Sequence, residues 1–131
     1  KILMITTAII QKLVATTAVT DLVGNRVNPN VIKPNSVFPA IYVFCDRMEL
    51  QDCYDASGTK QGVVEIGVFA KSYNEARLIM QAIRNALDNY TGIINNVGLL
   101  MMRGKEVSDE FDETKELHIK VIEFEAVAEP K

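Results

Sequence analysis

The chain has 131 residues, of which 48% are hydrophobic and 24% are charged, and its formal net charge is −3. This length and composition fit one globular domain of residues 1–131, and the acidic balance argues against a protein that neutralises nucleic-acid phosphates. No apolar run approaches the roughly 20 residues that cross a bilayer, and the apolar N-terminus is broken by Gln11 and Lys12, so neither a membrane partner nor a signal peptide is expected.

The first predicted element is helical and runs from about Thr7 to Val23. Apolar residues recur within it at helical spacing, Thr17 offers a second N-cap, and Gly24 is a natural stop. One kinked helix and two short helices both fit this pattern.

A loop and two strands are expected next. Residues 24–39 contain three prolines and four asparagines, which predicts a loop with at most a short extended piece at Arg26–Asn28. Residues 38–47 and 62–72 then read as the two strands of an antiparallel hairpin. Both strands carry apolar residues on both faces, so the face away from the helices needs cover from a second layer or another subunit.

Residues 72–92 form the clearest predicted helix. Ser72 and Glu75 match a capping box, and Gly92 is placed at the helix end. Residues at spacings of three and four define a stripe that faces the core, namely Ala76, Ile79, Met80, Ile83, Leu87 and Tyr90. The opposite side carries Arg77, Gln81, Arg84 and Asp88.

Two further strands are predicted at 98–107 and 117–127, joined by an acidic connection that projects from the sheet. The expected order of elements is α-β-β-α-β-β, in which hairpins dominate over crossovers. The fold class that follows is α+β, a mainly antiparallel four-stranded sheet with two helices packed on one face.

Few residues offer chemistry. His118 is the single imidazole and belongs to no metal or catalytic motif, which favours a structural role. Cys45 could act as a nucleophile only if His118 lay beside it. Cys45 and Cys53 could form a disulfide across a hairpin loop, but two reduced thiols in a protein made in the cytoplasm are the simpler interpretation. No cofactor-binding motif is present in the sequence, and an enzyme is the weakest class.

One segment concentrates carboxylates, at Glu106, Asp109, Glu110, Asp112, Glu113 and Glu116. Their spacing lacks the EF-hand pattern and its glycine, so calcium is not expected. A solvated hairpin is the simpler interpretation, and an acidic edge that docks a basic neighbour or repels passing DNA is the functional one. The aromatic residues of the strands could suggest an RNA-binding platform, but they are not interleaved with basic residues.

Taken together, several segments resemble the tail-completion proteins of long-tailed phages and prophages, also called tail terminators or head-to-tail joining proteins. The residues that carry the resemblance are LVGNRVNP at 22–29, FPAIYVF at 38–44, the strand and helix at 63–92, and the acidic turn and closing strand DETKELHIKVIEFEAVAE at 112–129. The segment 48–60 has no counterpart in this pattern.

This resemblance implies a virion structural protein, made in the host bacterial cytoplasm and located in the tail. It implies a hexameric ring that caps the tail tube and joins it to the head connector, with no cofactor and no catalytic or metal-binding residue. The implied partners are further copies of the chain, the major tail tube protein, a head-completion or connector protein, and DNA that passes through the lumen without sequence-specific binding. Candidate interface or lumen residues are Asp109, Glu110, Asp112, Glu113, Arg26, Arg77, Arg84, Met48 and Asp52.

Other interpretations stay open. The chain could be a small cytosolic module that binds a protein or a ligand, an enzyme that uses Cys45 or His118, or a connector-side head-completion adaptor. A stable monomer with one exposed apolar patch would favour the binding module over a ring.

Overall fold

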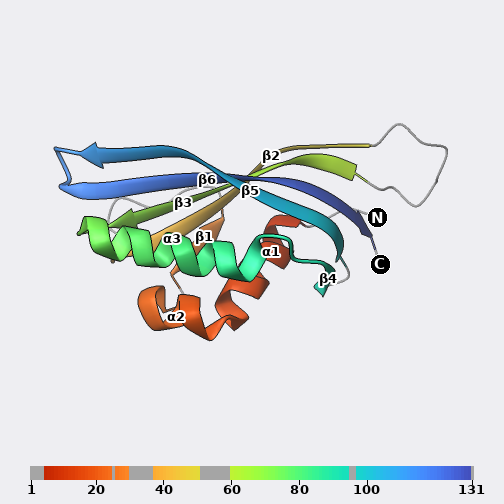
Figure 1. The fold of residues 1–131 in the computed structure, drawn as a ribbon, viewed down its shortest axis with the longest axis horizontal. Helices are drawn as coiled ribbons and strands as arrows, with labels where there is room; N and C mark the ends of the chain where they lie inside the picture. The colour runs from red at the N-terminus through yellow and green to blue at the C-terminus, as the bar shows by residue number, and fades with distance from the viewer. Residues whose placement is uncertain (1–4, 25, 30–36, 51–59, 95–96, 131) are drawn as a thin grey trace.

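The computed structural model describes residues 5–24, 26–29, 37–50, 60–94 and 97–130, with the backbone alone at 46–50, 60 and 130. These residues form a six-stranded sheet in the order β1-β2-β3-β6-β5-β4, and three helices lie together on one of its faces (Figure 1). The helices are α1 (Ile5–Ala15), α2 (Thr17–Val23) and α3 (Tyr73–Leu87). The strands are β1 (Val27–Pro29), β2 (Ala40–Leu50), β3 (Lys60–Ala70), β4 (Gly92–Ile94), β5 (Val97–Asp112) and β6 (Leu117–Pro130).

The predicted four-stranded sheet with two helices is wrong. The four expected strands are present as β2, β3, β6 and β5, each antiparallel to its neighbour, but two strands of three residues extend the sheet at its edges. β1 runs parallel to β2, which makes the sheet mixed. Three residues are too few to display the alternation by which a strand is recognised in a sequence.

The N-terminal helical segment consists of two helices, one of the two arrangements that the sequence allowed. The chain is extended at Thr16, with φ −92° and ψ 112°, and the Thr16 hydroxyl donates to the Lys12 carbonyl over 2.7 Å. Thr16 therefore precedes α2 as its N-cap, in place of the predicted Thr17. Gly24 ends α2 as predicted, with φ +61° and its N–H donating to the Thr20 carbonyl.

The start and the core stripe of α3 are confirmed, but its end is earlier than predicted. The Ser72 hydroxyl oxygen accepts from the Glu75 N–H over 3.1 Å, and five of the six predicted stripe residues are buried helical residues. The helix stops at Leu87 because the Asn89 N–H donates to the Met102 carbonyl of β5 over 2.7 Å. Asn89 takes φ 61°, a conformation that asparagine tolerates.

The acidic segment is strand where a loop was expected. β5 continues to Asp112 and pairs with β6 to Leu117, so the turn is confined to residues 113–116. The Asp112 side chain accepts the N–H groups of Thr114 and Lys115, a turn stabilised by an aspartate. Cross-strand pairing with apolar and basic residues of β6 lets this charged sequence remain extended.

The two faces of the sheet differ in cover. Val64, Ile66 and Val68 of β3 and the even-numbered residues 122–128 of β6 are buried in the core against the helices. Among the described elements no helix covers the opposite side, which we name the open face (Figure 1). The register places these side chains on the open face: Tyr42, Phe44, Val63, Glu65, Phe69, Arg103, Lys105, Ile119, Val121, Glu123 and Glu125.

Aromatic rings cover part of the open face. Tyr42 lies over Gly67, where any side chain would overlap its ring, and its hydroxyl donates to Glu65 Oε2 over 2.6 Å. The Tyr42 ring meets Phe69 edge-on with centroids 6.0 Å apart. Burial, then the hydrogen bond and negative charge of Glu65, raises the pKa of Tyr42 well above its usual value, so the hydroxyl stays a donor.

We expect Gly67→Ala to lower the free energy of unfolding by about 1–3 kcal/mol, because the new methyl group displaces the Tyr42 ring from the sheet. Val63→Ala is the matched control on the same strand and face, with an expected change of less than about 1 kcal/mol because Val63 is 36% exposed. Urea denaturation measures both values, and equal effects of the two variants would contradict this role of Gly67.

Candidate assembly surface

The two residues considered for catalysis lie far apart. Cys45 pairs with Val64 of β3, whereas His118 pairs with Ala70. Six residues of strand separate these positions, or about 20 Å at roughly 3.3 Å per residue, so the thiol and the imidazole cannot act together. His118 instead packs against the rings of Phe111 and Tyr73, with centroids 4.8 and 5.9 Å away.

The described residues hold no group of three or more His, Cys, Asp or Glu side chains placed to bind a metal ion. In the same part of the chain, none of the helices has the length and hydropathy to cross a membrane. The disulfide considered between Cys45 and Cys53 falls outside the described residues, because Cys53 is not among them.

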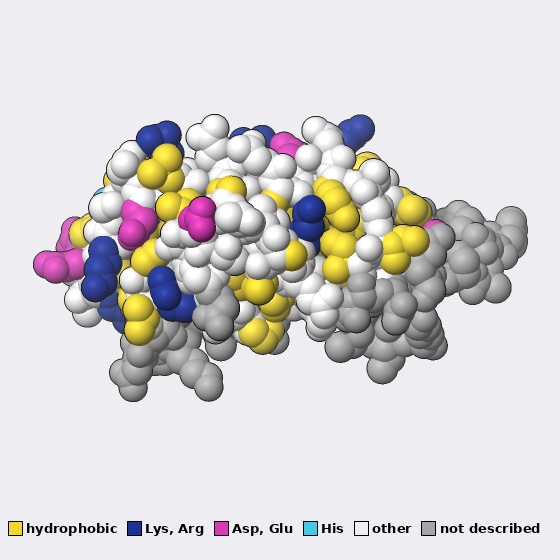
Figure 2. All heavy atoms as spheres, turned by 90° about the horizontal axis from the view of Figure 1, so that it is seen from below, with side chains coloured by type: hydrophobic (Ala, Val, Ile, Leu, Met, Phe, Trp, Pro, Cys, Tyr) yellow, Lys and Arg dark blue, Asp and Glu magenta, His cyan; other side chains and the backbone are white. Residues whose placement is uncertain are grey.

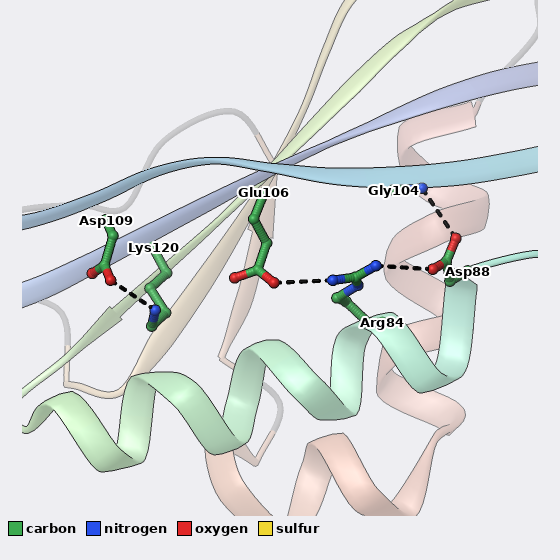
Figure 3. A network of polar contacts seen from close by, with 6 residues as sticks. All are labelled: Arg84, Asp88, Gly104, Glu106, Asp109 and Lys120. Carbon is green, nitrogen blue, oxygen red and sulfur yellow. Dashed lines mark hydrogen bonds and ion pairs between the residues drawn. The ribbon is translucent and has the colours of Figure 1, made fainter.

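A polar network joins the end of α3 to β5 (Figure 3). Arg84 contacts Glu106 over 3.0 Å and Asp88 over 3.3 Å, and Asp88 Oδ1 accepts the Gly104 N–H over 3.1 Å. Hydrogen bonds to Asp88 and to Glu106 raise the pKa of Arg84, because they stabilise its charged form. Asp88 is both the residue that caps α3 and a direct link to the sheet.

A second ion pair lies nearer the turn. Lys120 of β6 is 6% exposed, and its ammonium contacts Asp109 over 3.0 Å and lies 4.7 Å from the centre of the Tyr73 ring. Burial by itself lowers the pKa of Lys120, but the hydrogen bond and charge of Asp109 outweigh it and raise the pKa.

An open groove of about 620 Å³ runs between α3 and the β5–β6 hairpin, where both ion pairs lie. Arg84 and Lys120 reach into it from opposite sides, and each is already paired with a carboxylate. Because these charges compensate one another, we interpret the groove as a joint between helix and hairpin and not as a ligand site.

The four acidic candidates do not share one surface. Asp109 faces the helices and pairs with Lys120, whereas the register places Glu110 and Asp112 on the open face, and Glu113 lies in the turn. Three of these residues therefore surround the tip of the hairpin, at one end of the molecule (Figure 1).

The basic candidates also differ in surroundings. Arg26 Nε donates to the Pro39 carbonyl over 2.8 Å and so ties β1 to the start of β2. Arg84 belongs to the joint, whereas Arg77 is exposed on α3 and donates to the Asn74 side-chain oxygen over 2.8 Å. Met48 lies in β2 with an undescribed side chain, and Asp52 lies outside the described residues.

Sequence reasoning missed the joint and the buried ammonium. A lysine within the apolar run of β6, at the position of Lys120, is the signal that could have indicated a buried ion pair.

Comparison with known proteins assigns the chain to a family. The family model described as "Tail completion protein gp17" matches residues 7–129. The chain is a tail completion protein. This family membership confirms the resemblance inferred from the sequence and makes the protein a structural component of the phage tail.

A solved structure supports the same fold for this tail completion protein. A chain in the virion of a native gene transfer agent particle matches it with a TM-score of 0.72 at 19% sequence identity, over 95% of this chain and 93% of that chain. At this identity the likeness concerns the fold alone. No curated protein matches the sequence significantly.

We expect Asp109→Asn to destabilise the protein by roughly 1–2 kcal/mol, because it leaves the buried Lys120 ammonium without a counter-charge. Lys120→Met, which removes the charge and keeps the aliphatic stem, should change stability by less than about 1 kcal/mol. Thermal and urea unfolding of both variants test this order, and a larger loss for Lys120→Met would contradict it.

Two replacements of Asp88 test its hydrogen bond to the Gly104 N–H. We expect Asp88→Ala to cost about 1–3 kcal/mol, since the Gly104 N–H loses its acceptor, and Asp88→Asn to cost less because an acceptor remains. Asn85→Ala, on the exposed side of the same helix, is the control. Urea unfolding gives the three values, and equal costs for the two Asp88 variants would argue against the hydrogen bond.

Proposed function

We propose that this tail completion protein forms a hexameric ring that caps the tail tube and joins the tail to the head connector. The observation that carries the proposal is the open face, which bears aromatic and aliphatic side chains but has no helical cover among the described elements. In a structural tail protein, such a face is most simply covered by another protein subunit.

A ring follows from how such a subunit can repeat. When one surface of a subunit binds a different surface of the next, rotation closes the assembly and no copy is left with a free surface. The open face and the helical side differ in shape and composition, which suits such a heterologous contact better than a two-fold dimer.

The tip of the β5–β6 hairpin suits a contact outside the joint. Glu110, Asp112 and Glu113 surround the tip, and Phe111 is 50% exposed between the first two. We propose that these residues reach a neighbouring copy, the major tail tube protein or the connector, or else face the lumen. In the lumen, carboxylates would repel passing DNA and so prevent binding to any particular sequence.

The remaining candidates have unequal support. Arg77 suits an intermolecular ion pair, whereas Arg26 and Arg84 already serve contacts within the chain. Met48 and Asp52 remain proposals from the sequence. A role in catalysis is not part of the proposal, since the thiol and the imidazole are widely separated.

Native mass spectrometry of the purified chain over a range of concentrations tests the ring. We expect a hexamer that grows with concentration at the expense of the monomer. Electron microscopy of the same sample should show closed rings with a central opening. Dimers that do not grow further, or open filaments, would contradict the proposal.

Reversing the charge at the hairpin tip tests its part in assembly. We expect the triple variant Glu110→Lys, Asp112→Lys and Glu113→Lys to reduce ring formation or tail joining at least tenfold, because a carboxylate contact becomes a repulsive one. Asp21→Lys, exposed on α2, is the control for a single such charge reversal away from the tip. Normal assembly and tail joining by the triple variant would remove the tip from the proposed interface.

A further inference from the structure

Two carboxylates lie opposite each other on the open face. Glu65 of β3 lies directly opposite Glu123 of β6 in the register. Like charges at directly opposed positions destabilise a sheet. Lys105 on the far side of Glu123 and the hydroxyl of Tyr42 beside Glu65 each compensate part of this charge.

Aromatic rings adjoin the two glutamates. Phe44 is opposite Glu65 on β2, Tyr42 lies two residues from Phe44 on the same strand, and Phe69 lies four residues from Glu65 on β3. A planar guanidinium can pair with carboxylates while its face lies on an aromatic ring, which a compact ammonium does less well. The chemistry of this site therefore fits an arginine from another subunit.

The outer side of α3 offers such an arginine. We define this side by its exposed residues Asn74, Arg77, Leu78, Gln81 and Asn85. Leu78 is 40% exposed next to Arg77, and the exposed positions of α3 include no carboxylate. Figure 2 shows the helical side of the molecule, where hydrophobic side chains lie together with several basic and some acidic ones.

These two surfaces belong to opposite sides of the protein. α3 packs with its buried stripe against the core on the helical side of the sheet, so its outer side points away from the open face (Figure 1). A single copy therefore cannot bring Arg77 to Glu65 and Glu123, but two copies can, with each copy using one surface toward each neighbour.

We infer that the outer side of α3 of one copy docks on the open face of the next, with Arg77 between Glu65 and Glu123 and Leu78 against the partly buried aromatic rings of that face. This inference rests on the proposed ring and names the two surfaces that build it. The contact covers aromatic and aliphatic side chains of the open face, compensates the opposed glutamates and leaves the hairpin tip available for a different partner.

A charge exchange between two variants tests the contact. Arg77→Glu alone and Glu123→Arg alone should each weaken self-association at least tenfold, because each places like charges at the contact. An equimolar mixture of the two variants should recover assembly, since the altered Arg77 position of one variant meets the altered Glu123 position of the other, while the other contact is the original pair. Native mass spectrometry should then show rings that contain equal numbers of both variants.

Two single variants serve as controls of the same charge change. Lys71→Glu lies before α3 and Asp21→Arg lies on α2, both at exposed positions outside the contact, and both should assemble as the original chain does. Circular dichroism and thermal unfolding establish that Arg77→Glu and Glu123→Arg are folded before they are mixed. Leu78→Ala should weaken association without any change of charge.

The outcomes separate this inference from the proposed function. If both single variants still form rings, or if mixing them does not restore assembly, the inferred contact is wrong. The proposed ring is not contradicted by either result. Absence of self-association of the original chain, by native mass spectrometry and by sedimentation at high concentration, overturns the ring and the contact together.

Discussion

Three helices bury their apolar sides against one face of the sheet, and this one-sided packing is the constraint on which the rest of the structure depends. The core gathers between helices and sheet, and the buried residues of β3 and β6 alternate accordingly. The chain's own aromatic rings cover part of the opposite face, and the rest lies next to solvent or next to another protein. Gly67 allows part of this cover within one chain, because without a side chain it leaves room for the Tyr42 ring over the sheet.

The same one-sided packing explains the polar joint. The β5–β6 hairpin is long, and contacts to α3 hold it in place: Glu106 pairs with Arg84, and Lys120 and His118 both lie against the Tyr73 ring. Arg84 and Asp88 fix the end of the helix to β5, and Lys120 anchors the hairpin nearer its turn. Partly exposed ion pairs contribute little stability individually, so their main effect is to fix the position of the hairpin relative to the helix.

For a structural tail protein, the placement of surface side chains matters more than a reactive group. The described residues bring neither a nucleophile and base nor a set of metal ligands together, and the chain belongs to the tail completion family. The open face carries aromatic side chains and glutamates beside Arg103 and Lys105, whereas the outer side of α3 carries an exposed arginine and no exposed carboxylate. In the contact that we infer, this difference would orient each copy, because Arg77 of one copy meets the opposed glutamates of the next.

The sequence by itself determined the elements that have a long periodic pattern, namely four strands and the helix that follows Ser72. It also determined the helix stop at Gly24 and the family. It predicted only a short extended piece at Arg26–Asn28, where β1 lies, and no strand at β4, since strands of three residues exist only through pairing partners supplied by the tertiary structure. The acidic segment was predicted as a loop because charge suggests solvent, whereas pairing with β6 keeps it extended to Asp112. Only the tertiary structure decided which carboxylates meet a cation within the chain, as Asp109 does with Lys120, because that depends on strand register and not on spacing along the chain.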